Sequence, residues 1–278
     1  MFRRKIISII IICALVIWAL VGISPVAAQT PGQALPNDST EYEPTKAQLL
    51  SLYSNQVQSY QTVYRRYSLA TVQYDKLLTL TALGELVNAT KETMLKRGDV
   101  LVSYIDILYL ELRFTQNIDP KIKQDLLRRL EDFHDAFLNQ QVLITNSQDY
   151  QAINERAATF EKLIIDFEPI SIETKVAINK AKITVADETS RVFYQQVSDY
   201  YQKNPVSGFQ AVERQRAKEE IDKAFSQLSD LWTEFDKLGL KEKQKASQSW
   251  YSQVLKSLNS LQNQLLIIYS YLEEASRL

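Results

Sequence analysis

Glu131 and His134 form the pattern in this chain whose residue types and spacing come closest to a metal site. Three residues apart on a helix, the two side chains lie on one face, and di-iron helical bundles use this Glu-x-x-His spacing twice. His134 is the only histidine among the 278 residues, so the chain cannot supply a second copy of the pattern. We therefore expect a solvated helix face here, with Phe133 and Phe137 packed inward, and no metal or other cofactor.

Other residue patterns that support catalysis are also missing from the sequence. Cys13 is the only cysteine and lies inside an N-terminal apolar run, which excludes cysteine–histidine catalysis in the rest of the chain. The single histidine excludes multi-histidine zinc sites. No two glycines lie close enough together to form a phosphate-binding loop. Arg97, Gly98 and Asp99 spell an adhesion tripeptide, but a heptad seam runs through them and predicts helix instead of a presented loop. We expect that the protein is not an enzyme.

The first 28 residues have the pattern of an export signal. A basic head at residues 3–5 precedes an apolar run at residues 6–23, and small residues ending at Ala28 mark a cleavage site. If cleavage fails, the 18 apolar residues are long enough to act as a membrane anchor. Under both interpretations residues 29–278 lie outside the cytoplasm, so we expect a secreted, periplasmic or cell-surface protein.

The composition after the signal predicts an all-α protein. Residues 29–44 contain three of the seven prolines and are expected to form a flexible tether. Later residues contain few glycines and prolines and no alternating strand pattern, while apolar residues recur with heptad spacing. These features predict an antiparallel up-and-down bundle of long, amphipathic, coiled-coil-like helices. We assign residues 45–206 to the bundle and residues 207–278 to a C-terminal helical hairpin packed on the same bundle.

Several helix boundaries can be placed from capping residues. Thr45 and Gln48 have the spacing of a capping box, which predicts the start of the first helix. Asp119 followed by Pro120 predicts another helix start, because proline is favoured at the first helical position. Pro169 is expected either to kink its helix or to end it at the preceding residue. The continuity of the chain through residues 79–86 is left open.

Tyrosines dominate the first expected helix. Members of its seam are spaced by alternating steps of four and three, which keeps one stripe facing a neighbouring helix. We interpret most of these tyrosines as packing residues whose rings are buried against the neighbouring helix and whose hydroxyls reach the solvent-exposed edge of the contact. The alternative is a ligand-binding surface with a cavity lined by Tyr60, Tyr64 and Tyr67. The full seam is Tyr53, Val57, Tyr60, Tyr64, Tyr67, Thr71, Tyr74 and Leu78.

The last expected helix contains a second candidate surface. Residues 265–272, LLIIYSYL, are apolar nearly all round, so this segment must be buried centrally or covered by a partner. The candidate interaction or ligand surface therefore combines residues from both helices. Its members are Tyr60, Tyr64, Tyr67, Tyr74, Leu265, Ile268, Tyr269 and Leu272.

The charge balance gives little reason to expect a nucleic-acid partner. Without residues 1–28 the chain has 29 basic and 33 acidic residues, a net charge of −4. We expect a protein partner or self-association through helix faces, with membrane contact only through residues 6–23 if they are retained. The predicted function is an exported helical scaffold or interaction module of the cell envelope or surface. The alternative is an extracytoplasmic ligand-binding or sensor-like bundle that acts with a partner subunit.

Overall fold

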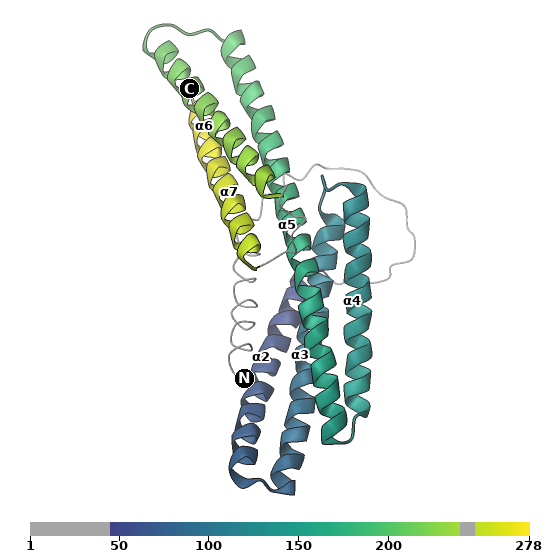
Figure 1. Cartoon of the computed structure of the whole chain (residues 1–278). Helices are drawn as coiled ribbons and strands as arrows, with labels where there is room; N and C mark the ends of the chain where they lie inside the picture. Colours follow the sequence, from purple (N-terminus) through teal and green to yellow (C-terminus); the bar gives the residue numbers. More distant parts are fainter. Residues whose placement is uncertain (1–44, 240–247) are drawn as a thin grey trace. The chain divides into compact units, whose positions relative to one another are not determined.

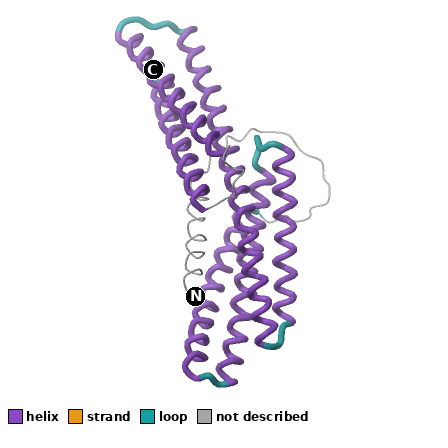
Figure 2. Tube along the Cα trace, viewed as in Figure 1, coloured by secondary structure: helices purple, strands orange, loops and turns teal. Residues whose placement is uncertain are grey.

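The computed structural model describes residues 45–239 and 248–278, which form six α-helices (Figure 1, Figure 2). The expected export signal and tether at residues 1–44, and residues 240–247, lie outside the described residues. The predicted all-α fold class is confirmed. The helices are α2 (Lys46–Leu77), α3 (Leu80–Phe114), α4 (Pro120–Asn146), α5 (Tyr150–Lys203), α6 (Phe209–Gly239) and α7 (Gln248–Ser276).

The predicted helix starts are present with their capping bonds. The Thr45 hydroxyl accepts a hydrogen bond from the Gln48 amide, and the Gln48 side chain accepts one from the Thr45 amide at 2.7 Å. The Asp119 carboxylate caps α4 by accepting from the Lys121 amide at 2.8 Å, with Pro120 in the first turn. Both caps satisfy amide groups that have no partner inside their own helix, which is why short local patterns predicted them.

The helix hairpins of the first part of the chain are antiparallel. Tyr53 near the start of α2 lies beside Tyr104 near the end of α3, with ring centroids 6.1 Å apart. Further along, the Thr93 hydroxyl of α3 donates a hydrogen bond to the Val63 carbonyl of α2 at 3.4 Å. The connection between these helices consists only of Leu78 and Thr79. The first expected helix therefore does not continue through residues 79–86, because residues 80–86 already belong to α3.

Helix α3 has two apolar faces. Met94, Leu101, Ile105, Leu108 and Leu112, the seam visible in the sequence, pack with α4 and α5. A second line lies about 100° round the helix from the first and packs with α2. Its members include Ala82, Leu86, Thr93, Val100 and Ile107. Because both faces are covered, α3 lies between α2 and the α4–α5 pair.

Helix α5 continues for 54 residues through Pro169, so the possibility that it ends at residue 168 is wrong. Proline removes one backbone hydrogen bond from a helix. Phe167 and Ile170 on either side of the proline are buried in the cluster formed with α3 and α4, and this packing holds the helix together. Tertiary packing therefore decides a point that the local sequence leaves open.

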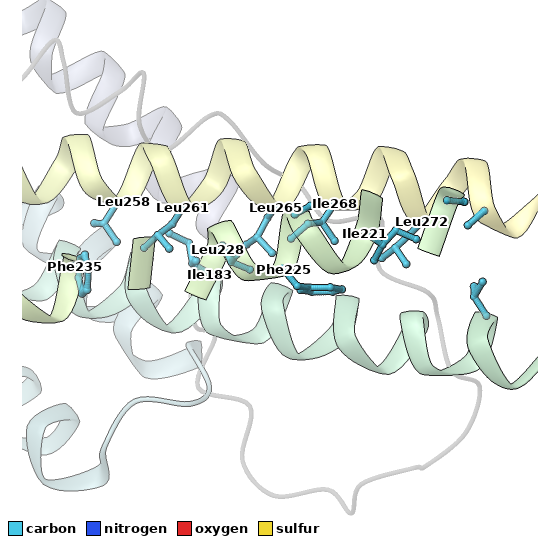
Figure 3. Packing of buried hydrophobic residues seen from close by; sticks show 14 of the residues in the cluster. Ile183, Ile221, Phe225, Leu228, Phe235, Leu258, Leu261, Leu265, Ile268 and Leu272 are labelled. Carbon is cyan, nitrogen blue, oxygen red and sulfur yellow. The ribbon is translucent and has the colours of Figure 1, made fainter. Parts of the chain in front are cut away.

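The second half of α5 forms a separate packing centre with α6 and α7. Ile183 and Val197 from α5 join a cluster whose other members come from α6 and α7 (Figure 3). The Tyr201 hydroxyl donates to the Ala275 carbonyl at 2.6 Å, and Lys175 lies over the Tyr251 ring. These two contacts show that α7 runs parallel to α5. The expected boundary at residues 206–207 remains a prediction, and α5 contributes to both clusters.

Candidate interaction surface

The candidate tyrosines of α2 form a ladder along one side of the helix. Tyr60 and Tyr64 have ring centroids 5.9 Å apart, and Tyr64 and Tyr67 are 6.0 Å apart, with both pairs tilted. These three rings and Tyr74 are half-buried, whereas Tyr53 is buried against α3. We refer to Tyr60, Tyr64, Tyr67 and Tyr74 as the tyrosine ladder. All four lie on α2.

The buried residues of α2 that face α3 differ from the predicted seam. The seam consists of two sets of residues with heptad spacing, and the difference lies in the set, or row, that contains Tyr64 and Thr71. The buried positions of that row are Val63 and Ala70, in place of Tyr64 and Thr71, which are half-buried like Tyr60, Tyr67 and Tyr74. The two helices pack closely through small side chains, and a pattern that scores only large apolar residues overlooks these.

The outer face of α2 is uncharged over a long stretch. Residues 47–64 contain no acidic or basic side chain, and α2 packs along its length on α3 alone among the described helices. The nearest charges on either side that form ion pairs are Lys46, bound to Glu111, and Arg66, bound to Glu92 at 2.9 Å. The exposed polar side chains of this stretch are Gln48, Ser51, Ser54, Asn55, Gln58, Ser59, Gln61 and Thr62.

The candidate residues of α7 divide between the core and its edge. Leu265, Ile268 and Leu272 are buried among α5, α6 and α7 (Figure 3). Tyr269 lies at the edge, where its hydroxyl donates to the Ala186 carbonyl of α5 at 3.0 Å. Burial raises the pKa of the Tyr269 hydroxyl, and the nearby carboxylate of Asp187 raises it further.

Residues 265–272 were expected either to be buried centrally or to be covered by a partner, and only one side of the segment is buried. One side of the segment is central to the core, while Leu266 and Ile267 on the other side are exposed. The structure does not bring the α7 candidates together with the tyrosine ladder, because α2 packs on α3 and α7 packs on α5 and α6.

The structure also contains an exposed apolar tip that was not identified from the sequence. Leu77, Leu78 and Leu80 surround the turn between α2 and α3, and these residues are 62%, 74% and 88% exposed. The signal that could have identified it is the stretch KLLTL, which places leucines where a helix end usually has glycine or asparagine.

The residues with candidate metal chemistry lie on a solvated face. His134 has its Nε2 atom 3.5 Å from an Asp106 carboxylate oxygen and its Nδ1 atom 3.3 Å from Asp135, while Glu131 is exposed. Burial raises the pKa of Asp106, and the adjacent His134 partly offsets this rise. Within residues 45–239 and 248–278, no three histidine, cysteine, aspartate or glutamate side chains gather in a metal-binding arrangement.

The Arg97–Gly98–Asp99 tripeptide lies in the interior of α3, as the seam predicted. Gly98 is buried, and Arg97 forms an ion pair with Glu161. Asp99 accepts hydrogen bonds from Lys96 at 2.9 Å and from Gln141 at 2.8 Å. The tripeptide therefore has the conformation of a helix with its side chains engaged by α4 and α5.

None of the helices in the described part of the chain combines the length and apolar character that a membrane span requires. Comparison with protein-family models, curated proteins and solved structures finds no match to this chain.

Proposed function

We propose that this protein is an exported, non-catalytic helical interaction module that associates with a second copy of itself through α2. The observation that carries the proposal is the uncharged outer face of residues 47–64, flanked by the tyrosine ladder. A helix face that meets only water is ordinarily rich in charged residues. Protein interfaces are instead depleted of lysine and acidic residues and enriched in tyrosine.

The chemistry of this face supports a second copy as the partner. Side chains such as Asn55, Gln58 and Gln61 each contain both hydrogen-bond donors and acceptors, so two copies of the face can bond to one another. Two uncharged faces meet without like-charge repulsion, and they offer no electrostatic attraction to a strongly charged partner. The 18 uncharged residues extend about 27 Å along the helix, which is enough for a pairing of about five turns.

Export is supported by the N-terminal sequence. A basic head, an apolar run and a small-residue cleavage site precede the helical region. Mass spectrometry of the protein recovered from cells tests this part of the proposal. A chain starting at Gln29 in an extracytoplasmic fraction is the expected result, and a cytoplasmic protein still carrying Met1 would contradict it.

Self-association is tested by placing charge on the α2 face. The double variant Asn55→Lys and Gln58→Lys changes two exposed residues, so we expect an intact helical fold but a predominantly monomeric protein in sedimentation experiments. An Asn55→Glu and Gln58→Glu variant is expected to be monomeric by itself and to form dimers when mixed with the lysine variant. Only pairing between α2 faces predicts this recovery.

A matched control places the same charge elsewhere. Ser226→Lys and Ser229→Lys add two lysines to exposed positions of α6 and should leave the oligomeric state unchanged. A wild-type protein that is monomeric at all accessible concentrations, or lysine and glutamate variants that fail to associate on mixing, would show that α2 does not pair with itself.

A further inference from the structure

The apolar tip of the α2–α3 hairpin stands apart from the rest of the surface. Leu80 is the most exposed large apolar side chain in the described part of the chain, and Leu77 and Leu78 lie beside it in sequence. The connection consists of two residues, so the three leucines lie close together in sequence at the end of the α2–α3 hairpin (Figure 2). An exposed apolar cluster of this kind is characteristic of an interaction site.

The backbone of Leu78 provides a second, independent observation. This residue ends α2 in the left-handed region, with φ of 51° and ψ of 31°. Glycine or asparagine adopts this conformation readily, whereas leucine adopts it at an energetic cost. Such a departure from local preference is common at functional sites. The presence of leucine in this unfavourable conformation is explained if its exposed side chain takes part in an interaction with another molecule.

The turn does not need its leucines in order to close. The Leu78 amide donates to the Tyr74 carbonyl at 2.9 Å, and the Thr79 hydroxyl accepts from the Ala82 amide at 3.2 Å. The Leu83 amide also donates to the Thr79 carbonyl at 3.0 Å. These bonds satisfy backbone groups at the tip, which lowers the cost of moving the tip out of water.

The arrangement of side chains behind the tip favours a lipid surface over a protein pocket. Tyr74 lies about one turn behind the leucines, at the depth where aromatic rings occupy the membrane interface. Lys76 is exposed, and its long side chain can extend towards the headgroups. An apolar tip at the end of a hairpin requires a concave site in a protein partner, whereas fluid hydrocarbon adapts to its shape.

The charges near the tip indicate which lipids would be bound. Asp75 and Lys76 are adjacent and opposite in sign, and Glu85 lies a little more than one turn into α3. Their sum is one negative charge, so anionic lipid gains no electrostatic attraction. We propose that Leu77, Leu78 and Leu80 insert shallowly into the hydrocarbon edge of an electrically neutral lipid bilayer. This inference goes beyond self-association and does not depend on it.

The insertion can be measured with a fluorescent label at the tip of the full-length chain. A Cys13→Ser, Leu80→Cys protein carries one cysteine, which is labelled with the environment-sensitive dye NBD and mixed with phosphatidylcholine vesicles. We expect the emission to shift to the blue, to be quenched by lipids with a spin label on the acyl chain, and to lose its accessibility to aqueous iodide. The result reports on the tip even if residues 6–23 also bind the membrane.

A label on the side of α2 supplies the matched control. Leu69 is also strongly exposed but lies about two turns from the end of α2, so NBD at a Leu69→Cys position should remain accessible to iodide. Adding Leu77→Asn and Leu78→Asn to the tip-labelled protein should reduce the ratio of inserted to free tips at least about tenfold, because two apolar side chains no longer leave water. Asparagine suits the left-handed backbone at position 78, so thermal unfolding should show an intact fold.

Three results would overturn the inference. The label at position 80 could remain equally accessible to iodide with and without vesicles. Its emission could shift without lipid as protein concentration rises, which would identify the tip as a protein contact. Insertion could also require anionic lipid, which would contradict the neutral surface inferred from Asp75, Lys76 and Glu85.

Discussion

At the residue scale, Glu111 is the carboxylate that connects three helices. Its side chain on α3 is 5% exposed, and it binds Lys46 of α2 and Lys182 of α5, the latter at 2.7 Å. Burial alone raises the pKa of Glu111, but the hydrogen bonds and charges of Lys182 and Lys46 outweigh it and hold the pKa below the usual range. The ionised carboxylate therefore stabilises the folded protein.

We expect Glu111→Gln to lower the free energy of unfolding by about 2 kcal/mol at pH 7, since charge-assisted bonds to half-exposed lysines are lost. The folded pKa lies below the unfolded one, so this contribution is present above about pH 4.3 and is lost as the pH falls through the folded pKa. Urea unfolding measured from pH 7 to pH 3 should show that the difference in the free energy of unfolding between wild type and variant becomes smaller as the pH falls. The exposed Glu131→Gln on α4 serves as control, and a gap independent of pH would contradict the expectation.

At the element scale, a single glycine sets the approach of α4 to α3. A Cβ atom at Gly98 would lie 2.6 Å from Gln141 Nε2 and 2.9 Å from Gln141 Cγ. The same Gln141 amide donates to the Leu95 carbonyl at 3.2 Å and to Asp99. Close packing here depends on the absence of a side chain, whereas Gly84 in the same helix has nothing within 4 Å of its would-be Cβ.

These two glycines give a prediction with an internal control. Gly84→Ala should raise the free energy of unfolding by about 0.5–1 kcal/mol, because alanine favours helix over glycine. Gly98→Ala gains the same propensity but must displace Gln141, and we expect a net loss of about 1–3 kcal/mol. Chemical denaturation of both variants measures the difference, and equal stabilisation by both would mean that Gln141 moves aside freely.

At the scale of the whole molecule, two packing centres share one long helix. The cluster of α3, α4 and the first half of α5 has no residue in common with the cluster of α6, α7 and the second half of α5. Regions with separate cores can open separately, with different free energies. We expect α6 and α7 to unfold together while α2, α3 and α4 remain folded.

Leu261→Ala tests this separation. Leu261 is fully buried in the cluster of α6, α7 and the second half of α5. Its truncation should lower the free energy of unfolding by about 2–5 kcal/mol. Hydrogen exchange should accelerate in α6, α7 and the second half of α5 and stay unchanged in α2–α4. Leu266→Ala, an exposed position of the same helix, should have little effect. Equal acceleration throughout the described chain would mean that the two clusters unfold as one unit.

Features that depend on nearby residues in the chain could be predicted before the fold was known. The all-α class, the caps at Thr45 and Asp119 and the helical state of Gly98 follow from propensity and from interactions three or four residues apart. For residues 265–272 the sequence limited the outcomes to central burial or a covering partner, and Leu265, Ile268 and Leu272 are buried.

The faces by which the helices contact one another could not be predicted in this way. The second apolar face of α3, the place of Val63 in the α2 contact and the passage of α5 through Pro169 all depend on partners distant in the sequence. The exposed leucines of the α2–α3 tip belong to the same group, since a leucine beside a turn is equally compatible with burial and exposure. Burial depends on what surrounds a residue in space, and the periodicity of one helix does not contain that information.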